Sequence, residues 1–87
     1  MKISLYMYRD YNSTSLKILK LLDKCNITPK IIIFESGIDL TKVSKKIGHS
    51  VRRLPKVVID NEFVGGYYDL VEYLIKKKVI NYSSEVL

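Results

Sequence analysis

The residues best suited to chemistry in this sequence are cations, and they gather in one segment. Between Leu40 and Ile59 there are six basic residues, no acid and the only histidine: Lys42, Lys45, Lys46, His49, Arg52, Arg53 and Lys56. The other residues include nine bases and nine acids, so this segment carries the whole formal net charge of +6. Such a field attracts anions: a carboxylate ligand, a phosphate backbone or an acidic protein surface. The alternative is a Lys-rich helix face in contact with water alone.

Sulfur chemistry has little basis in this chain. Cys25 is the one cysteine, which excludes an internal disulfide and an all-cysteine metal site within one chain, and we predict no metal site. No apolar run reaches the roughly 20 residues that a membrane-spanning helix needs. The N-terminus turns polar at Arg9 and Asp10 without a small-residue cleavage site. These features predict a cytoplasmic protein that makes no use of a membrane.

The spacing of apolar residues predicts four strands and three helices. The strands are expected at residues 3–8, 31–34, 57–59 and 63–64, and the helices at 16–25, 40–47 and 69–78. Ser13, Thr14 or Ser15 is a candidate cap for the first helix, and Asp39 for the second. The unbroken apolar run 31–34 is typical of a strand covered on both faces.

The element order β-α-β-α-β-β-α predicts an α/β domain. Two strand-helix-strand crossovers favour parallel strands in the middle, and a hairpin at Asp60 and Asn61 adds an antiparallel edge. Helices must cover both faces of such a sheet, and ligands gather at the carboxyl ends of its parallel strands. The turn at 9–14 follows the first strand at such an end. We expect one domain over residues 1–87, in which 78–87 form a flexible or docked tail.

A motif in the second half of the chain resembles a known family. Arg53-Leu54-Pro55 precedes the predicted hairpin, and Gly65-Gly66-Tyr67-Tyr68-Asp69-Leu70 follows it. This is similar to the glutaredoxins, which have Thr-Val-Pro, a hairpin and Gly-Gly-x-x-Asp-Leu at this spacing. Leu21-Leu22-Asp23-Lys24 resembles the end of that family's first helix. The resemblance covers about residues 3–77, extends to the small bacteriophage-type members, and implies a thioredoxin-like fold: a four-stranded mixed sheet with helices on both faces.

The chain departs from that family at its reactive motif. The family's Cys-x-x-Cys falls on Asn12-Ser13-Thr14-Ser15, so Asn12 and Ser15 stand where the two cysteines belong. Thiol–disulfide exchange needs a thiolate, which a helix N-terminus stabilises, and neither an amide nor a serine hydroxyl can replace it. Cys25 lies ten residues beyond Ser15, about 15 Å along the helix and near its negative end, so we expect it to be a packing residue. No catalytic residue is assigned, and dithiol–disulfide oxidoreductase activity is not expected.

The resemblance also implies a groove that binds glutathione. Leu54 would pair its backbone with the ligand, and Pro55 would follow a cis peptide bond, unless it is an ordinary trans proline opening an edge strand. The start of the last helix would take the γ-glutamyl group, and an arginine would hold the glycyl carboxylate. The ligand-binding residues implied are Arg9, Arg53, Leu54, Pro55, Gly66, Tyr67, Tyr68 and Asp69. The alternatives are solvated arginines and tyrosines that only pack.

Three functions are compatible with these residues. The first is a glutaredoxin-like binding module without redox cysteines, whose groove and basic segment engage an acidic protein or peptide. The second is a glutathione-binding or glutathione-dependent protein without a dithiol, in which Ser13, Ser15, Tyr8 or Tyr11 assists the bound thiolate. The third is nucleic-acid binding by the basic segment, with Tyr11, Tyr67 and Tyr68 stacking on bases. No cofactor is required, and glutathione is the one candidate.

Overall fold

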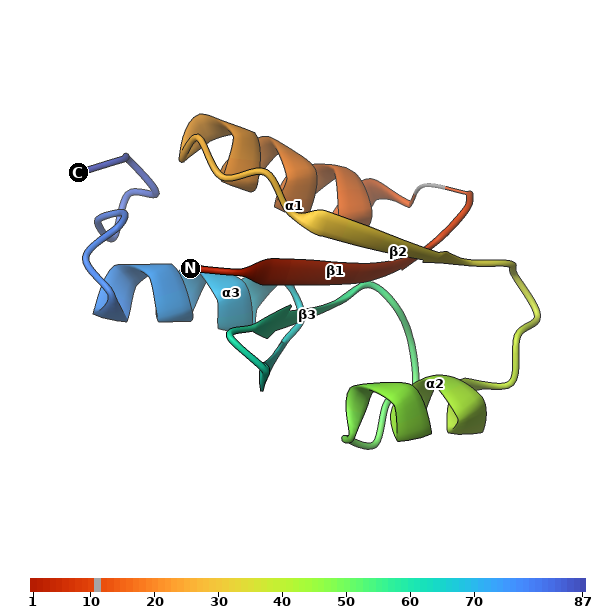
Figure 1. Cartoon of the computed structure of the whole chain (residues 1–87). Coiled ribbons are helices and arrows are strands. Elements are labelled where there is room, and N and C mark those ends of the chain that lie inside the picture. The colour runs from red at the N-terminus through yellow and green to blue at the C-terminus, as the bar shows by residue number, and fades with distance from the viewer. Residues whose placement is uncertain (11) are drawn as a thin grey trace.

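The computed structural model describes residues 1–10 and 12–87 and contains the predicted order of elements (Figure 1). The strands are β1 (Ile3–Tyr8), β2 (Lys30–Phe34), β3 (Lys56–Ile59) and β4 (Glu62–Gly65), and the helices are α1 (Ser13–Lys24), α2 (Leu40–Ile47) and α3 (Tyr67–Lys76). The prediction β-α-β-α-β-β-α is therefore confirmed. Within the described part of the chain, no helix is long and apolar enough to span a membrane.

The four strands form one mixed sheet in the order β2-β1-β3-β4. β1 pairs parallel with β2 and antiparallel with β3, and β3 pairs antiparallel with β4. The expectation that the second crossover would also make parallel strands was wrong. β3 starts at the end of the sheet where β2 ends, opposite Tyr6, and runs back antiparallel to β1.

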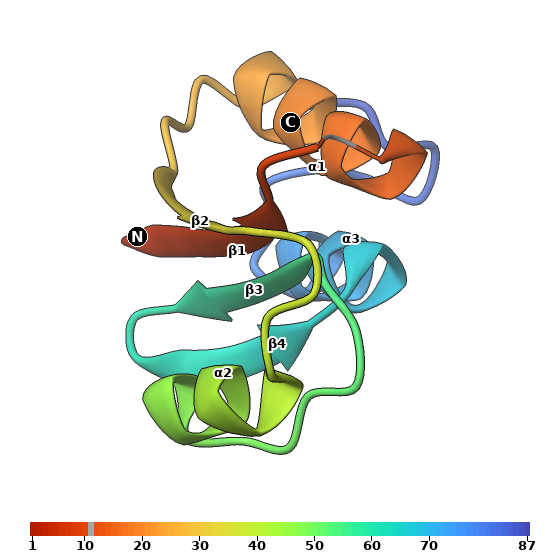
Figure 2. The same ribbon diagram turned by 90° about the vertical axis from the view of Figure 1, so that its right-hand side faces the viewer.

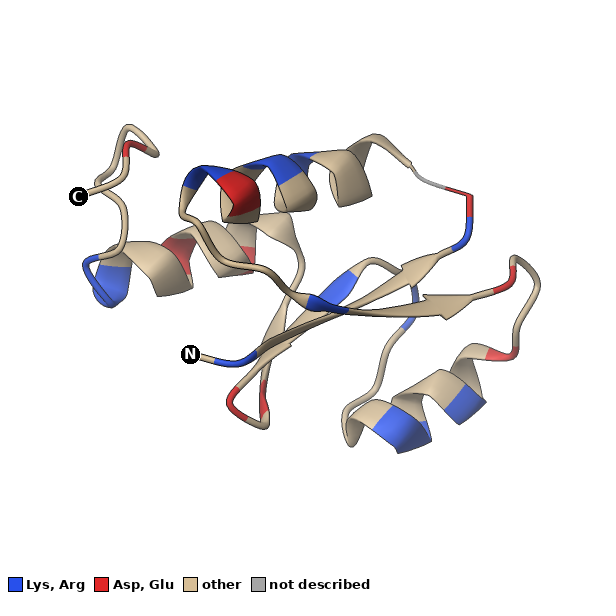
Figure 3. Ribbon diagram, turned by 45° about the horizontal axis from the view of Figure 1, so that its top comes forward, with Lys and Arg blue, Asp and Glu red and all other residues tan. Residues whose placement is uncertain are grey.

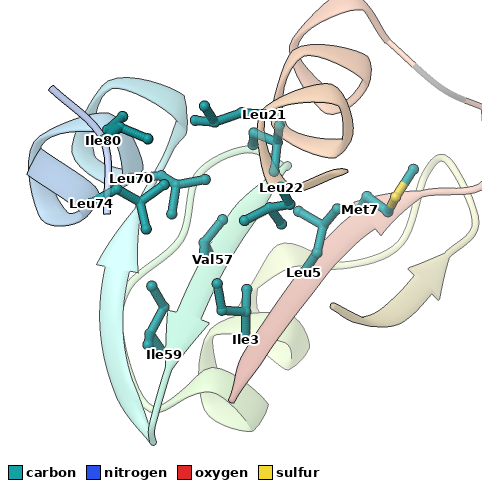
Figure 4. Close-up of a cluster of buried hydrophobic side chains, with 11 residues drawn as sticks. Ile3, Leu5, Met7, Leu21, Leu22, Val57, Ile59, Leu70, Leu74 and Ile80 are labelled. Atoms are coloured by element: carbon teal, nitrogen blue, oxygen red, sulfur yellow. The ribbon is translucent and has the colours of Figure 1, made fainter. Parts of the chain in front are cut away.

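Helices cover both faces of the sheet, as predicted. Alternate residues of β1 and β3 point toward α1 and α3 and form the larger core with side chains of those helices (Figure 4). On the other face, α2 lies apart from α1 and α3 (Figure 2) and contributes Val43 to a smaller core with Val51 and Leu54. Each fully buried aliphatic side chain contributes roughly 1.5–3 kcal/mol of transfer free energy, so the larger core carries most of the stability.

Strand β2 differs from its prediction. It lies at the edge of the sheet, paired only with β1. Ile31 is 42 % exposed and Ile33 is 43 % exposed, so the expectation that this strand would be covered on both faces was wrong. An apolar run predicts a strand, but it does not say whether that strand lies at the centre or at the edge.

The short connections follow the predicted local chemistry. Asp39 caps α2 by accepting the Thr41 N–H at 2.9 Å, and α2 ends at Gly48, whose φ of 82° is left-handed. The hairpin between β3 and β4 turns at Asp60 and Asn61, which have φ values of 49° and 68°. Both residue types tolerate positive φ, so the turn is tight and its register fixed.

The C-terminal tail is docked on the helices. Ile80 is 1 % exposed within the larger core and forms an isolated β-bridge with Val86. The Lys24 Nζ at the end of α1 donates to the carbonyl oxygen of Ser84 at 3.0 Å. The tail therefore covers one end of the layer formed by α1 and α3.

Candidate functional site

A groove of about 470 Å³ lies where the start of α1, the segment entering β3 and the start of α3 meet. Its size is in the range of small-ligand sites. Every ligand residue predicted from the sequence contributes to it, except Arg9. The lining residues are Asn12, Thr14, Lys17, Arg53, Leu54, Pro55, Lys56, Gly66, Tyr67, Tyr68 and Asp69.

Asn12 begins helix α1. Its backbone is extended, with φ −99° and ψ 171°, and its Oδ1 accepts the Ser15 N–H at 2.8 Å. The predicted cap at Ser13, Thr14 or Ser15 was wrong, because an asparagine amide one residue earlier satisfies the free N–H of the first turn. Ser15 is 1 % exposed. Asn12, expected at the family's first cysteine position, is thus a helix cap, and Ser15, expected at the second, is buried.

Leu54 and Pro55 form the edge of the groove that precedes β3. The peptide bond between them is cis, in agreement with the expectation from the sequence. The Leu54 side chain is 4 % exposed and packs with Val43 and Val51. Among the described residues, its backbone N–H and carbonyl make no backbone hydrogen bond. An extended ligand could therefore pair with the backbone of Leu54 without displacing an existing partner.

The start of helix α3 forms the opposite side of the groove. The Gly66 N–H donates to Asp69 Oδ2 at 3.1 Å, and Gly66 has no side chain to cap the helix. Lys56 Nζ lies 3.7 Å from the point that a Gly66 Cβ would occupy. The first N–H groups of a helix have no partner in that helix, so this end, with an ammonium beside it, suits an anion.

Two tyrosines stand at the same end. Tyr67 and Tyr68 meet edge to face with ring centroids 5.4 Å apart. Tyr68 is 80 % exposed, whereas Tyr67 is half-buried against the larger core. Lys17 Nζ lies 5.8 Å from the centre of the Tyr67 ring, within the range of a cation–π contact. Tyr67 thus positions a lysine of α1 at the groove.

The groove is positively charged. Lys17, Arg53 and Lys56 line it with Asp69 as the only carboxylate, which leaves a net charge of +2 there. The one ion pair among the described residues joins Arg9 to Glu35, so none of the three groove cations has a described carboxylate partner. Arg9, a predicted ligand residue, is paired outside the groove.

The structure divides the basic segment. Arg53 and Lys56 line the groove, while lysines of α2 lie on a separate part of the surface (Figure 3). Lys46 Nζ lies 5.7 Å from the centre of the Phe34 ring, and His49 stacks on Phe63 with centroids 4.0 Å apart. Lys42, Lys45 and Arg52 are exposed and also lie outside the groove. The segment is therefore not one uniform patch.

Sequence reasoning missed two groove residues, Thr14 and Lys17. They are three positions apart at the start of α1, and such residues share a helix face. With the helix beginning at Ser13, both lie on one face of its first turns. The signal was present, but the helix start was predicted too late.

Cys25 lies away from the groove. It ends α1 and packs at the boundary of the larger core. Burial raises the pKa of its thiol above the ordinary value, and the charge of Lys24 offsets part of that increase. Cys25 is therefore a neutral packing residue near pH 7. Among the described residues, no group of three metal-ligating side chains is present.

Solved structures share this architecture. Glutaredoxin 1 from Francisella tularensis, solved with cacodylate, superposes with a TM-score of 0.72 at 17 % identity, over 87 % of this chain and 93 % of that one. A glutaredoxin from Escherichia coli gives 0.67 at 19 % identity, over 88 % and 96 %. The chain has the glutaredoxin fold.

The glutaredoxin fold also occurs within longer proteins. A glutathione transferase homologue from Burkholderia, in a structure that holds glutathione, superposes with a TM-score of 0.71 at 20 % identity. The match covers 94 % of this chain and 46 % of that one. No protein-family model and no curated protein matches the sequence. The likeness to these proteins is thus one of fold alone.

Proposed function

We propose that this chain is a redox-inactive binding module with a glutaredoxin fold, whose groove holds an acidic, extended protein segment. One observation carries the proposal. The open backbone of Leu54 lies in the same groove as Lys17, Arg53 and Lys56, which have no described carboxylate partner. Backbone pairing suits an extended chain, and the cations select acidic side chains.

The residues at the cysteine positions support a binding role over an exchange reaction. Exchange begins when a thiolate attacks a disulfide sulfur. Asn12 instead offers an amide, which is already engaged with the Ser15 N–H, and Ser15 is a buried hydroxyl. Cys25 is a neutral thiol at the other end of α1. The groove can therefore bind a ligand, but it has no sulfur to donate electrons.

Fluorescence anisotropy tests this function with a labelled Glu-rich decapeptide and a Lys-rich decapeptide as control. We expect the Glu-rich probe alone to bind, and to bind more weakly as salt rises through screening. Reversing Lys17, Arg53 and Lys56 together should weaken binding at least about tenfold.

Lys17→Glu and Lys20→Glu form a matched pair. Both change one exposed lysine of α1, but only Lys17 lines the groove. Equal effects of the two variants, or binding that ignores ionic strength, would refute a groove-directed interaction.

Glutathione is the second candidate ligand. A short peptide with a carboxylate end would suit the open backbone of Leu54 and the start of α3, and the Burkholderia homologue with this fold holds glutathione. In an NMR titration, this candidate predicts amide shifts at Leu54, Tyr68 and Asp69. An unchanged spectrum at millimolar glutathione would remove it and leave the acidic segment as the ligand.

A further inference from the structure

We infer that the free edge of β2 pairs with β2 of a second copy of this chain, joining two sheets into one. The Phe34 carbonyl accepts the Arg9 N–H at 2.9 Å, on the side of β1. Backbone groups alternate in direction along a strand, so Lys30, Ile32 and Phe34 face β1, and Ile31 and Ile33 present their N–H and C=O groups to the open side.

These outward groups have no partner among the described residues outside the sheet. The side chains beside them are also uncovered, since Ile31 is 42 % exposed and Ile33 is 43 % exposed. Natural proteins usually protect an open edge with a bulge, a proline or an inward charge. Within β2, Lys30–Phe34, the only charge is at the first residue.

The opposite edge of the same sheet is protected. β4 has four residues, begins with the charge of Glu62 and ends at Gly65, whose φ is 123°. A register shift between Val57 and Val58 interrupts its pairing with β3. The contrast identifies β2 as the edge that is suited to accept another strand.

A second copy fits this edge in one antiparallel register. About a two-fold axis at Ile32, Ile31 of one chain lies opposite Ile33 of the other, and each such pair exchanges two hydrogen bonds. All outward N–H and C=O groups of Ile31 and Ile33 are then satisfied, and the four exposed isoleucines cover one another.

The neighbouring registers fit less well. A shift one way places Pro29, which has no N–H, opposite Ile33. A shift the other way places the charge of Glu35 opposite Ile31. The strand is therefore complementary to itself in the register centred on Ile32.

The edge of β2 carries little charge that could select the acidic segment proposed for the groove. Lys30 is the one cation in β2, and the nearby Arg9 is neutralised by Glu35. Since each copy carries +6, added salt should screen the repulsion between copies and strengthen the dimer. Salt should have the opposite effect on an acidic ligand in the groove, so the two proposals can fail separately.

Sedimentation equilibrium of the purified chain, from about 10 μM to 1 mM, tests the dimer. We expect association that strengthens with salt. Ile31→Lys and Ile33→Glu should each weaken it at least about tenfold, because each places a charge opposite an isoleucine. Both sites are exposed, and circular dichroism confirms that the variants fold.

The register is tested by mixing the two variants. In the register centred on Ile32, Lys at 31 of one chain lies opposite Glu at 33 of the other, so the mixture should form a heterodimer at concentrations where each variant alone is monomeric. A wild-type chain that stays monomeric at 1 mM would overturn the proposal. A dimer indifferent to both substitutions, or strengthened by Ile31→Lys alone, would also overturn it.

Discussion

Replacing Asn12 with alanine should destabilise the protein by a predictable amount. The Asn12 Oδ1 is the side-chain acceptor for the first turn of α1, with a 2.8 Å bond from the Ser15 N–H. Removing an N-cap of this type costs about 1 kcal/mol, within a range of roughly 0.5–2 kcal/mol. For a domain of this size, about 1 kcal/mol lowers Tm by roughly 4–8 °C.

Urea unfolding followed by circular dichroism measures this effect. We expect a lower midpoint for Asn12→Ala with an unchanged slope, because the cap affects stability and not the surface exposed on unfolding. Asn12→Asp and Asn12→Ser retain an acceptor and should lose much less. Ser13→Ala is the matched control, since the neighbouring Ser13 is exposed and makes no side-chain cap bond. If Asn12→Ala were neutral, or no worse than Ser13→Ala, the assignment of Asn12 as a structural cap would be refuted.

Three further predictions concern α1 and the start of α3. In a Cys25→Ser background, Asn12→Cys should have a thiol pKa below the ordinary 8.5, measured by absorbance at 240 nm, because its thiolate can accept N–H groups at the helix start; a pKa no lower than that of Ser13→Cys would contradict this. Gly65→Ala should cost about 1–3 kcal/mol in urea unfolding, because its Cβ would collide with the Asp69 carboxylate at a φ of 123°. Gly37→Ala, with a φ of 88° and open space, should cost less. Cys25 should react with iodoacetamide at pH 8 more slowly than a cysteine peptide does, because burial raises its thiol pKa, and urea should abolish the difference. Because burial in the folded state favours the neutral thiol of Cys25, this thiol should contribute stability at low pH. This stability should be lost as the pH rises through the folded-state pKa of the thiol.

Local chemistry made several elements predictable. The alternation of Ile3–Tyr8, the cap at Asp39 and the turn at Asp60 and Asn61 depend on neighbouring residues alone, and the structure has all of them. Pro55 and the glycines before α3 indicated the groove through the resemblance to the glutaredoxins that these residues carry. These positions carry most of the groove that the sequence anticipated.

What could not be predicted depends on contacts between distant segments. The exposure of Ile33 follows from the place of β2 at the edge of the sheet, and the direction of β3 is seen only in its antiparallel pairing with β1. Lys17 reaches the groove because Tyr67, fifty residues away, packs beside it. The pairing of Arg9 with Glu35 likewise joins two turns that the sequence leaves unrelated.

Leu54 connects the smaller core to the groove. Its side chain is anchored under α2 with Val43 and Val51, while its main chain borders the ligand space. A bulkier residue at position 43 or 51 would displace the main chain of Leu54 without touching any bound molecule. The fit of the groove can therefore be adjusted from the opposite face of the sheet, by apolar substitutions that alter neither its charge nor its lining.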